Sequence, residues 1–226
     1  KIPGNMKAEC MESMASNLWI KQAQSEHIDN IDRWVQKNIL PEFPGISLTA
    51  LEEFKTDMRT ATFLNWSEKE DERGKGFFCF QHRSFQEFFI ARRIARFLSS
   101  ANPEPLNIPK ISDETAEFVL GLLKTHQALG EYDLQESKKT IEKTLEESYL
   151  PQISENALLL LLKWKELSPD FYPLPRRFCL SRASLSGFIF KSLDLRNSLF
   201  DEAELEGARF IDCDLSHSSF CGAKMK

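Results

Sequence analysis

The side chains that could carry catalysis or bind a metal are few in this 226-residue chain. Its four histidines are scattered, so a zinc site is not expected. Its five cysteines are odd in number and have no C-x-x-C pair, which argues against a disulfide framework. No nucleophile elbow and no G-x-x-x-x-G-K-[ST] phosphate loop occurs in the sequence. We therefore expect no catalytic residues and no metal site in this chain.

His82 is the residue whose position most suggests a binding role. It stands just before Ser84 and Glu87, which match a capping box and predict a helix start. The free backbone N–H groups of such a start, together with the helix dipole, favour an anion. The alternative is a histidine that packs at a strand–helix junction without a ligand. The residues alone leave both possibilities open.

Three helices and two short strands are expected before His82. Apolar residues spaced by four predict a helix from Met6 to about Ala23, Asp29 is expected to cap a second helix, and a capping box at Thr49 starts a third. Two β-prone runs, 61–66 and 77–80, flank a charged hairpin tip at 67–76. This order is typical of a winged helix. With the helix that follows, it defines a first domain at residues 1–99.

Charge argues against a DNA-binding role for this domain. The third helix would be the reading helix, and it carries more carboxylates than cations: Glu52, Glu53 and Asp57 against Lys55 and Arg59. Phosphate would repel such a surface. The whole chain has a formal net charge of −5, and no segment has a basic excess. We therefore do not expect nucleic acid as a partner.

The segment around His82 resembles the end of the winged-helix region in NACHT-type (STAND) signal-transduction ATPases, which include the NOD-like receptors. It reads F-x-H-x-S-F-Q-E-F-F from Phe80, with A-R-R from Ala91. The resemblance implies that His82 contacts a phosphate of bound ADP in a closed, inactive state. It also implies ATP or ADP with Mg²⁺ in the intact protein, held by an ATPase module expected before residue 1.

A helical domain is expected at residues 112–168, after a proline-rich connector at 101–111. Ser112, followed by acidic residues, is a typical helix N-terminus. The expected buried residues of this helix are Phe118, Leu122, Leu123 and Leu129. A charged helix is expected at about 133–148. The last helix contains the run 157–162, which is apolar all round and must be covered on several sides.

Residues 177–226 follow a five-residue rule, with a large apolar residue at the centre of each unit. The centres are Leu180, Leu185, Phe190, Leu195, Phe200, Leu205, Phe210, Leu215, Phe220 and Met225. A period of five forms no stripe on a helix and alternates faces on a strand. The chain must therefore turn a corner every five residues. Four sides close a square coil, and about two and a half coils would stack about 4.8 Å apart.

Residues twenty apart should then lie above one another and match in size. Phe190 falls over Phe210 and Phe200 over Phe220, while leucines occupy the other two walls. The blocks themselves, such as A-S-L-S-G and A-E-L-E-G, resemble pentapeptide repeats of the A-[DN]-L-x-x type. That resemblance implies a right-handed quadrilateral β-helix.

The first coil departs from the pentapeptide pattern. Phe178, Phe188 and Leu193 stand where that family has small residues. We expect a widened first coil whose bulky residues dock on the apolar run 157–162, because so short a coil is marginal alone. Met225, at the other end, has no cap in this sequence, so either further repeats follow it or that end pairs with another chain.

Composition and hydropathy favour a soluble protein. Apolar residues make up 42% and charged residues 28% of the chain, as in ordinary globular proteins. No apolar run approaches the length of a membrane span, and no basic-then-apolar leader is present. Cytoplasm is therefore the expected location. The chain opens with Lys1 rather than Met, which suggests a fragment of a longer protein.

The expected fold class is α+β multi-domain: a winged helix and a helical domain, followed by a pentapeptide-repeat β-helix at residues 177–226. The leading hypothesis is a non-catalytic regulatory and sensor region of a prokaryotic NACHT-type signalling NTPase with a role in antiphage defence. Its partners would be a protein ligand bound by the repeat and the upstream NTPase domain. Two alternatives are a DNA-mimicking coil that inhibits a topoisomerase and a self-association module that forms homo-oligomers. The 7 basic and 7 acidic residues of segment 177–226 argue against mimicry, which needs an acidic column.

Overall fold

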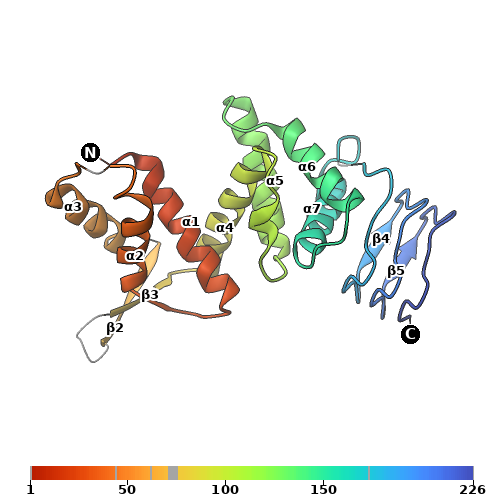
Figure 1. The fold of residues 1–226 in the computed structure, drawn as a ribbon, viewed down its shortest axis with the longest axis horizontal. Coiled ribbons are helices and arrows are strands. Elements are labelled where there is room, and N and C mark those ends of the chain that lie inside the picture. Colours follow the sequence, from red (N-terminus) through yellow and green to blue (C-terminus); the bar gives the residue numbers. More distant parts are fainter. Residues whose placement is uncertain (1, 44, 62, 71–75, 173, 226) are drawn as a thin grey trace. The chain divides into compact units, whose positions relative to one another are not determined.

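The computed structural model describes residues 2–43, 45–61, 63–70, 76–172 and 174–225 (Figure 1). The chain divides into two compact units, Lys1–Arg93 and Ile94–Lys226. The boundary falls inside helix α4 (Arg83–Leu98), so α4 contributes residues to both. Part of the predicted hairpin tip, residues 71–75, lies outside the described residues.

Three helices open the first unit: α1 (Gly4–Ile20), α2 (Asp29–Asn38) and α3 (Leu48–Arg59) (Figure 1). The apolar stripe predicted for α1 is buried at its spacing of four, through Met6, Cys10, Met14 and Leu18. The indole of Trp34 on α2 stacks on the ring of Phe54 on α3, with ring centroids 6.1 Å apart and planes 8° from parallel. This unit therefore has an apolar core of its own.

Neither of the two predicted capping boxes marks the helix start, and Asp29 is the first residue of α2 rather than its cap. Helix α3 begins at Leu48, where the Ser47 hydroxyl accepts a hydrogen bond from the Ala50 N–H at 3.2 Å, so Thr49 lies within the helix. Helix α4 begins before Ser84, and the Glu87 carboxylate accepts from the Arg83 side chain at 3.0 Å. The S/T-x-x-E pattern identifies the neighbourhood of a helix start, but a neighbouring residue takes the first position.

A three-stranded antiparallel sheet completes the first unit. Its strands are β1 (Glu26–His27), β2 (Leu64–Glu70) and β3 (Gly76–Phe80), in the order β1-β3-β2. Phe78 is fully buried at the centre, opposite Glu26 on one neighbour and Trp66 on the other. Strand β1 was not predicted, because two residues are too few to show a period. The helices and the β2–β3 hairpin follow the predicted order.

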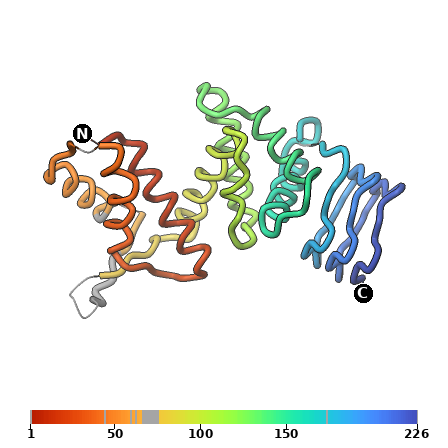
Figure 2. Tube along the Cα trace, viewed as in Figure 1, coloured from red at the N-terminus to blue at the C-terminus, as the bar shows by residue number. Residues whose placement is uncertain are grey.

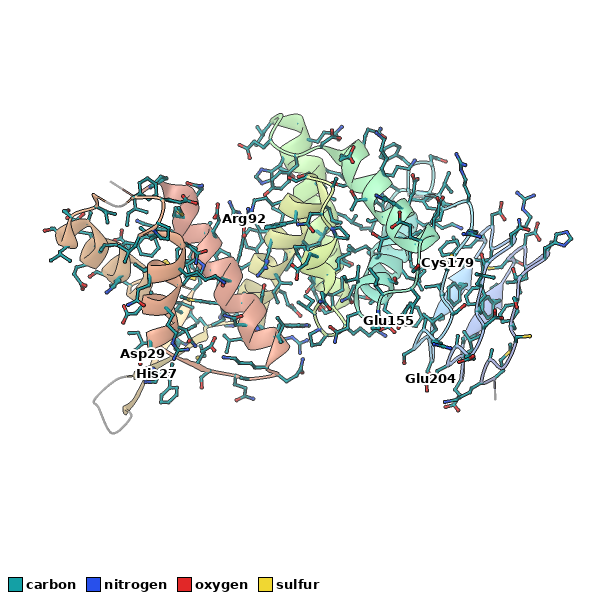
Figure 3. All side chains as sticks on the ribbon, in the orientation of Figure 1. His27, Asp29, Arg92, Glu155, Cys179 and Glu204 are labelled. Carbon is teal, nitrogen blue, oxygen red and sulfur yellow. The ribbon has the colours of Figure 1, made fainter. Side chains whose placement is uncertain are left out.

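The first part of α4 is bonded to α1. The Arg92 guanidinium (labelled in Figure 3) donates to the Glu12 carboxylate, which is 1% exposed. The Gln86 side-chain amide donates to the Ala15 carbonyl at 3.2 Å. The Arg92 guanidinium offsets part of the cost of burying this carboxylate. These contacts fix the segment that begins directly after His82.

The second unit continues with a short 3-10 helix, η1 (Glu104–Leu106), and helices α5 (Asp113–Ala128), α6 (Leu134–Glu146) and α7 (Ile153–Leu167). The predicted cap of α5 is confirmed, since the Ser112 hydroxyl accepts from the Thr115 N–H at 3.0 Å. The Asp133 carboxylate caps α6 in the same way, because it accepts a hydrogen bond from the Glu136 N–H at 2.9 Å.

Helix α7 lies at the centre of this helical part and contacts α5, α6 and η1. Leu158, Leu160 and Leu161 of its apolar run are fully buried, as is Trp164. On α5 the prediction holds for Leu123, and Phe118 and Leu122 are half-buried. The fourth expected residue, Leu129, is 65% exposed. It follows the last turn of α5 as its C-cap, so the helical period no longer directs it inward.

A buried amide holds the proline-rich connector against α7. The Asn156 side chain accepts from the Ile111 N–H at 3.0 Å and donates to the carbonyls of Leu106 and Ile108, both at 2.9 Å. Asn156 is fully buried. Because buried backbone groups need partners, the three bonds of this one side chain allow an irregular segment to pack inside the unit.

Residues 177–225 form a coil with a twenty-residue repeat (Figure 2). Strands β4 (Ile189–Lys191) and β5 (Arg209–Ile211) pair in parallel with a register of twenty, and five isolated bridges share that register. The backbone has positive φ at every fifth residue: Arg182, Gly187, Ser192, Asn197, Glu202, Gly207, Asp212, His217 and Gly222. Each is a corner, so the predicted four-sided coil is confirmed in its period and its turns.

Candidate functional site

The ten predicted centres of the coil lie along its interior with decreasing burial. Leu180, Leu185, Phe190, Leu195 and Phe200 are fully buried, and Leu205 is 3% exposed. Phe210, Leu215 and Phe220 are half-buried, and Met225 is 54% exposed. Burial falls because each side chain of an inner coil is covered from two directions and those of the last described coil from one.

Two columns of phenylalanine form opposite walls of this interior. Phe190 stacks on Phe210 with ring centroids 4.8 Å apart, and Phe200 stacks on Phe220 at 4.9 Å, with interplanar angles of 4° and 7°. Across the interior, Phe190 meets Phe200 edge to face at 6.0 Å. These spacings match the stacking distance of paired strands, as the twenty-residue register requires.

The outward positions of three sides form charge pairs that run from one coil to the next. Arg182 lies above Glu202 at 2.9 Å on the first side, and Lys224 lies below Glu204 at 3.1 Å on the second. On the fourth side Arg196 contacts Asp194 at 2.6 Å and Asp214 at 3.6 Å. Arg182, Arg196 and Lys224 are therefore each paired with a carboxylate of the coil.

These contacts shift the pKa values of the carboxylates on the fourth side. Hydrogen bonds from Arg196 lower the pKa of Asp194 below its ordinary value. Bonds from the Ser216 hydroxyl and N–H, with a smaller contribution from Arg196, lower the pKa of Asp214. Both carboxylates are exposed to water, so each contact contributes little to stability.

The third side, formed by β4 and β5, is different. We call the outward residues Ile189, Lys191, Arg209 and Ile211 the β4–β5 face. In the parallel register Ile189 lies opposite Arg209 and Lys191 opposite Ile211, so cations and β-branched side chains alternate in both directions. Ile189 is 50% exposed, and both cations are exposed. Among the described residues neither cation has a carboxylate partner.

The first coil is closed on its near edge by α6, α7 and the loop between them. The Cys179 N–H donates to the Leu145 carbonyl at 2.8 Å, and the Ser184 N–H donates to the Glu155 carboxylate at 3.0 Å. Lys165 of α7 donates to the carbonyl of Lys191 at 2.8 Å and also to that of Ser192. Figure 3 labels Glu155 and Cys179 at this junction.

These bonds supply partners to backbone groups that an inner coil would receive from its neighbour. The predicted docking residues, Phe178, Phe188 and Leu193, are 1%, 7% and 4% exposed, so the first coil is covered on this edge. Glu155 also accepts from the Tyr149 hydroxyl at 2.5 Å. Burial first, and then the Glu155 carboxylate, raises the pKa of Tyr149. Burial lowers the pKa of Lys165.

His82 is exposed, directly before the first residue of α4. Its carbonyl accepts from the Phe85 N–H at 3.1 Å, and its ring lies 5.9 Å from that of Phe85. The structure thus places the imidazole at a helix start, as predicted. The neighbouring Arg83 is turned toward Glu87 and lies over the Trp19 ring at 5.1 Å. Among the described residues, the fold brings no second predicted site residue to His82.

A hollow of the second unit borders the coil. It has a volume of about 630 Å³, lies between the α6–α7 loop and the first coil, and is lined by residues such as Tyr149, Arg177 and Leu199. Within the described part of the chain, no group of three or more histidine, cysteine or acidic residues could hold a metal ion. Over the same residues, no helix is long and apolar enough to cross a membrane.

Sequence reasoning missed the residues that close the near edge of the coil. Leu145 lies on α6 and Glu155 and Lys165 lie on α7, and nothing in the local sequence identifies them as partners of the coil. The corners did carry a signal, because Gly187, Gly207 and Gly222 occupy positions with φ near +70° that favour glycine.

Comparison with known protein families gives a match in the coil. The family model for pentapeptide repeats matches residues 179–216 and 189–226, with eight copies. The matched residues, 179–226, are about a fifth of the chain. Among curated proteins, no match to this chain is found. The C-terminal part of the chain therefore contains pentapeptide repeats, and these indicate a protein-interaction or structural module.

Proposed function

We propose that this chain is the non-catalytic regulatory and sensor region of a NACHT-type signalling NTPase, in which the coil recognises a protein partner. One observation carries the proposal. The near edge of the coil is bonded to α6 and α7 through Leu145, Glu155 and Lys165, whereas its outer sides face solvent. A partner bound on the coil would therefore act directly on the helical part.

In this proposal the first unit is a winged helix that stabilises the ADP-bound closed state. Its three helices and the β2–β3 hairpin have the required order, and the motif that begins at Phe80 carries the family resemblance. His82 is exposed at the start of α4, where a phosphate oxygen from the NTPase domain could reach its ring and the backbone N–H groups. His82 would be the phosphate contact.

The residues of this chain could supply only the phosphate contact of a nucleotide site. The sequence has no phosphate loop, and the described residues contain no acidic cluster suited to Mg²⁺. When bound to the intact protein, ATP or ADP would supply the phosphate that His82 contacts. This chain's own residues would hold that phosphate and position α4 through the Arg92–Glu12 pair.

Recognition by the coil would bias a closed-to-open equilibrium. Coupling between two sites is commonly about 1–3 kcal/mol, or roughly 5- to 150-fold in affinity. A partner that binds the open form more tightly by this amount shifts the population accordingly, and it must lose affinity by the same factor when ADP is bound.

The experiment is a substitution of His82 in the intact NTPase. His82→Ala should speed ADP release and raise activity in the absence of a partner, because the closed state loses a phosphate contact. His217→Asn, at an exposed corner of the coil that tolerates asparagine, is the matched control and should leave ADP retention unchanged. Wild-type ADP retention and activity in His82→Ala would remove the nucleotide-sensor role.

The topoisomerase-inhibitor alternative is disfavoured by the charge pairs of the coil. Duplex mimicry needs unpaired carboxylates in a column, yet Glu202, Glu204 and Asp194 each contact a cation. Supercoiling by DNA gyrase should therefore proceed unchanged at stoichiometric concentrations of this chain. Inhibition there would reverse the ranking of the two functions.

A further inference from the structure

Three cations of the coil, on three of its four sides, are paired with carboxylates. Arg182, Arg196 and Lys224 each contact a carboxylate on the coil, at 2.6 to 3.1 Å. On the β4–β5 face, Lys191 and Arg209 contact none among the described residues. Two exposed cations on a small sheet repel each other, so this arrangement gives the isolated coil no electrostatic stabilisation.

Two further lysines, Lys165 and Lys110, border this face. Lys165 of α7 donates to the carbonyls of Lys191 and Ser192, which places its ammonium group at one end of β4. The Lys110 ammonium lies over the ring of Phe188, the residue before β4, at 4.7 Å. No ion pair is recorded for either lysine within the described part of the chain. Four cations thus occupy or border the face.

Apolar surface lies between these charges. Ile189 is 50% exposed and Ile211 is half-buried, on strands that form the longest continuous ladder of the coil. The backbone groups of β4 and β5 bond along the coil axis, so a ligand on this face would meet side chains only. Alternating cations and β-branched residues are complementary to a chain in which carboxylates alternate with apolar side chains.

We propose that the β4–β5 face, bordered by Lys110 and Lys165, is the partner-binding surface of the coil and that it takes an acidic polypeptide segment with interspersed aliphatic residues. This inference rests on the proposed role of the coil in protein recognition and names the side and the ligand chemistry. A nucleic acid fits less well, because four cations separated by isoleucines neutralise few phosphates and the chain carries a net charge of −5.

The test is selection of a random twelve-residue peptide library on the full 226-residue chain, followed by anisotropy titration of the enriched peptides. We expect enriched peptides with several Asp or Glu residues and aliphatic residues between them. Their affinity should fall at least tenfold in Lys191→Gln/Arg209→Gln and in Ile189→Ser. The matched control is Arg182→Gln/Lys224→Gln, which removes the same charge from two other sides and should change the affinity less than twofold.

Each contrary outcome has a distinct meaning. Enriched peptides without acidic residues, or equal losses in the two double variants, would overturn the face assignment while the coil remained a recognition module. No enrichment on any variant would overturn both this inference and the recognition role. Tighter binding of a twenty-nucleotide single strand than of any peptide would assign the face to nucleic acid instead. Helical circular dichroism confirms that each variant is folded.

Discussion

At the scale of single residues, the stacked phenylalanines should differ in energetic weight along the coil. Phe190 is fully buried between its neighbours, and Phe220 is half-buried in the last described coil. Phe190→Ala should lower the free energy of unfolding by about 3–5 kcal/mol, because it leaves a cavity. Phe220→Ala should cost about 1–2 kcal/mol, because part of the ring is already in water. Urea denaturation of both variants measures the difference, and equal costs would contradict it.

The Asp194–Arg196 contact makes a prediction about pH. A lowered pKa in the folded state means that the contact stabilises above the ordinary carboxyl pKa, near 4, and that this contribution is lost as the pH falls through the folded value. In Arg196→Gln the pKa of Asp194 should rise toward its ordinary value, and the Arg196 backbone bond keeps part of the shift. Carboxyl chemical shifts followed by NMR from pH 6 to 2 report it. An unchanged Asp194 titration would show that Arg196 is not the cause.

At the scale of elements, the near edge of the coil depends on one carboxylate of α7. Glu155 accepts from both the Ser184 N–H and the Tyr149 hydroxyl. Glu155→Ala should lower stability by about 2–3 kcal/mol, because both donors lose a charged acceptor. Glu166→Ala is the control on the same helix, since its carboxylate is exposed and should cost less than about 1 kcal/mol. Thermal unfolding distinguishes the two.

The elements also show how far local sequence determines this fold. The coil could be predicted because each centre, from Leu180 to Phe220, repeats one local geometry, and the spacing of five excludes other regular structures. The cap at Ser112 could be predicted for the same reason, since an N-cap is a contact within one turn. The choice of Ser47 over Thr49 depends on where the preceding loop leads, which no short pattern contains.

Contacts between distant segments were beyond sequence reasoning. Strand β1 has two residues and exists because Glu26 and His27 align with β3. The sequence does not distinguish Asn156 from other polar residues of α7, because its bonds are to the connector 45 to 50 residues earlier in the chain. The cations of the β4–β5 face could be recognised only when the twenty-residue register placed Lys191 opposite Ile211 and Arg209 opposite Ile189.

At the scale of the whole molecule, the second unit should open as one block. Its helices and coil share backbone bonds at Cys179, Ser184 and Lys191, so the coil cannot separate without exposing these groups. Native-state hydrogen exchange should give similar opening free energies for the amides of α7 and for Leu180 and Leu185 of the first coil. First-coil amides that open several kcal/mol more easily than those of α7 would contradict this.

The corner at every fifth residue has a consequence for how such a chain can change length. Inserting or deleting one five-residue unit would rotate every later side by a quarter turn, so the pairs Arg182–Glu202 and Phe190–Phe210 would be broken together. A duplication of twenty residues keeps each side in line and adds one complete layer. Related coils should therefore grow or shrink in whole layers of twenty residues, and shorter insertions or deletions should be tolerated only after the last stacked pair, Phe200–Phe220.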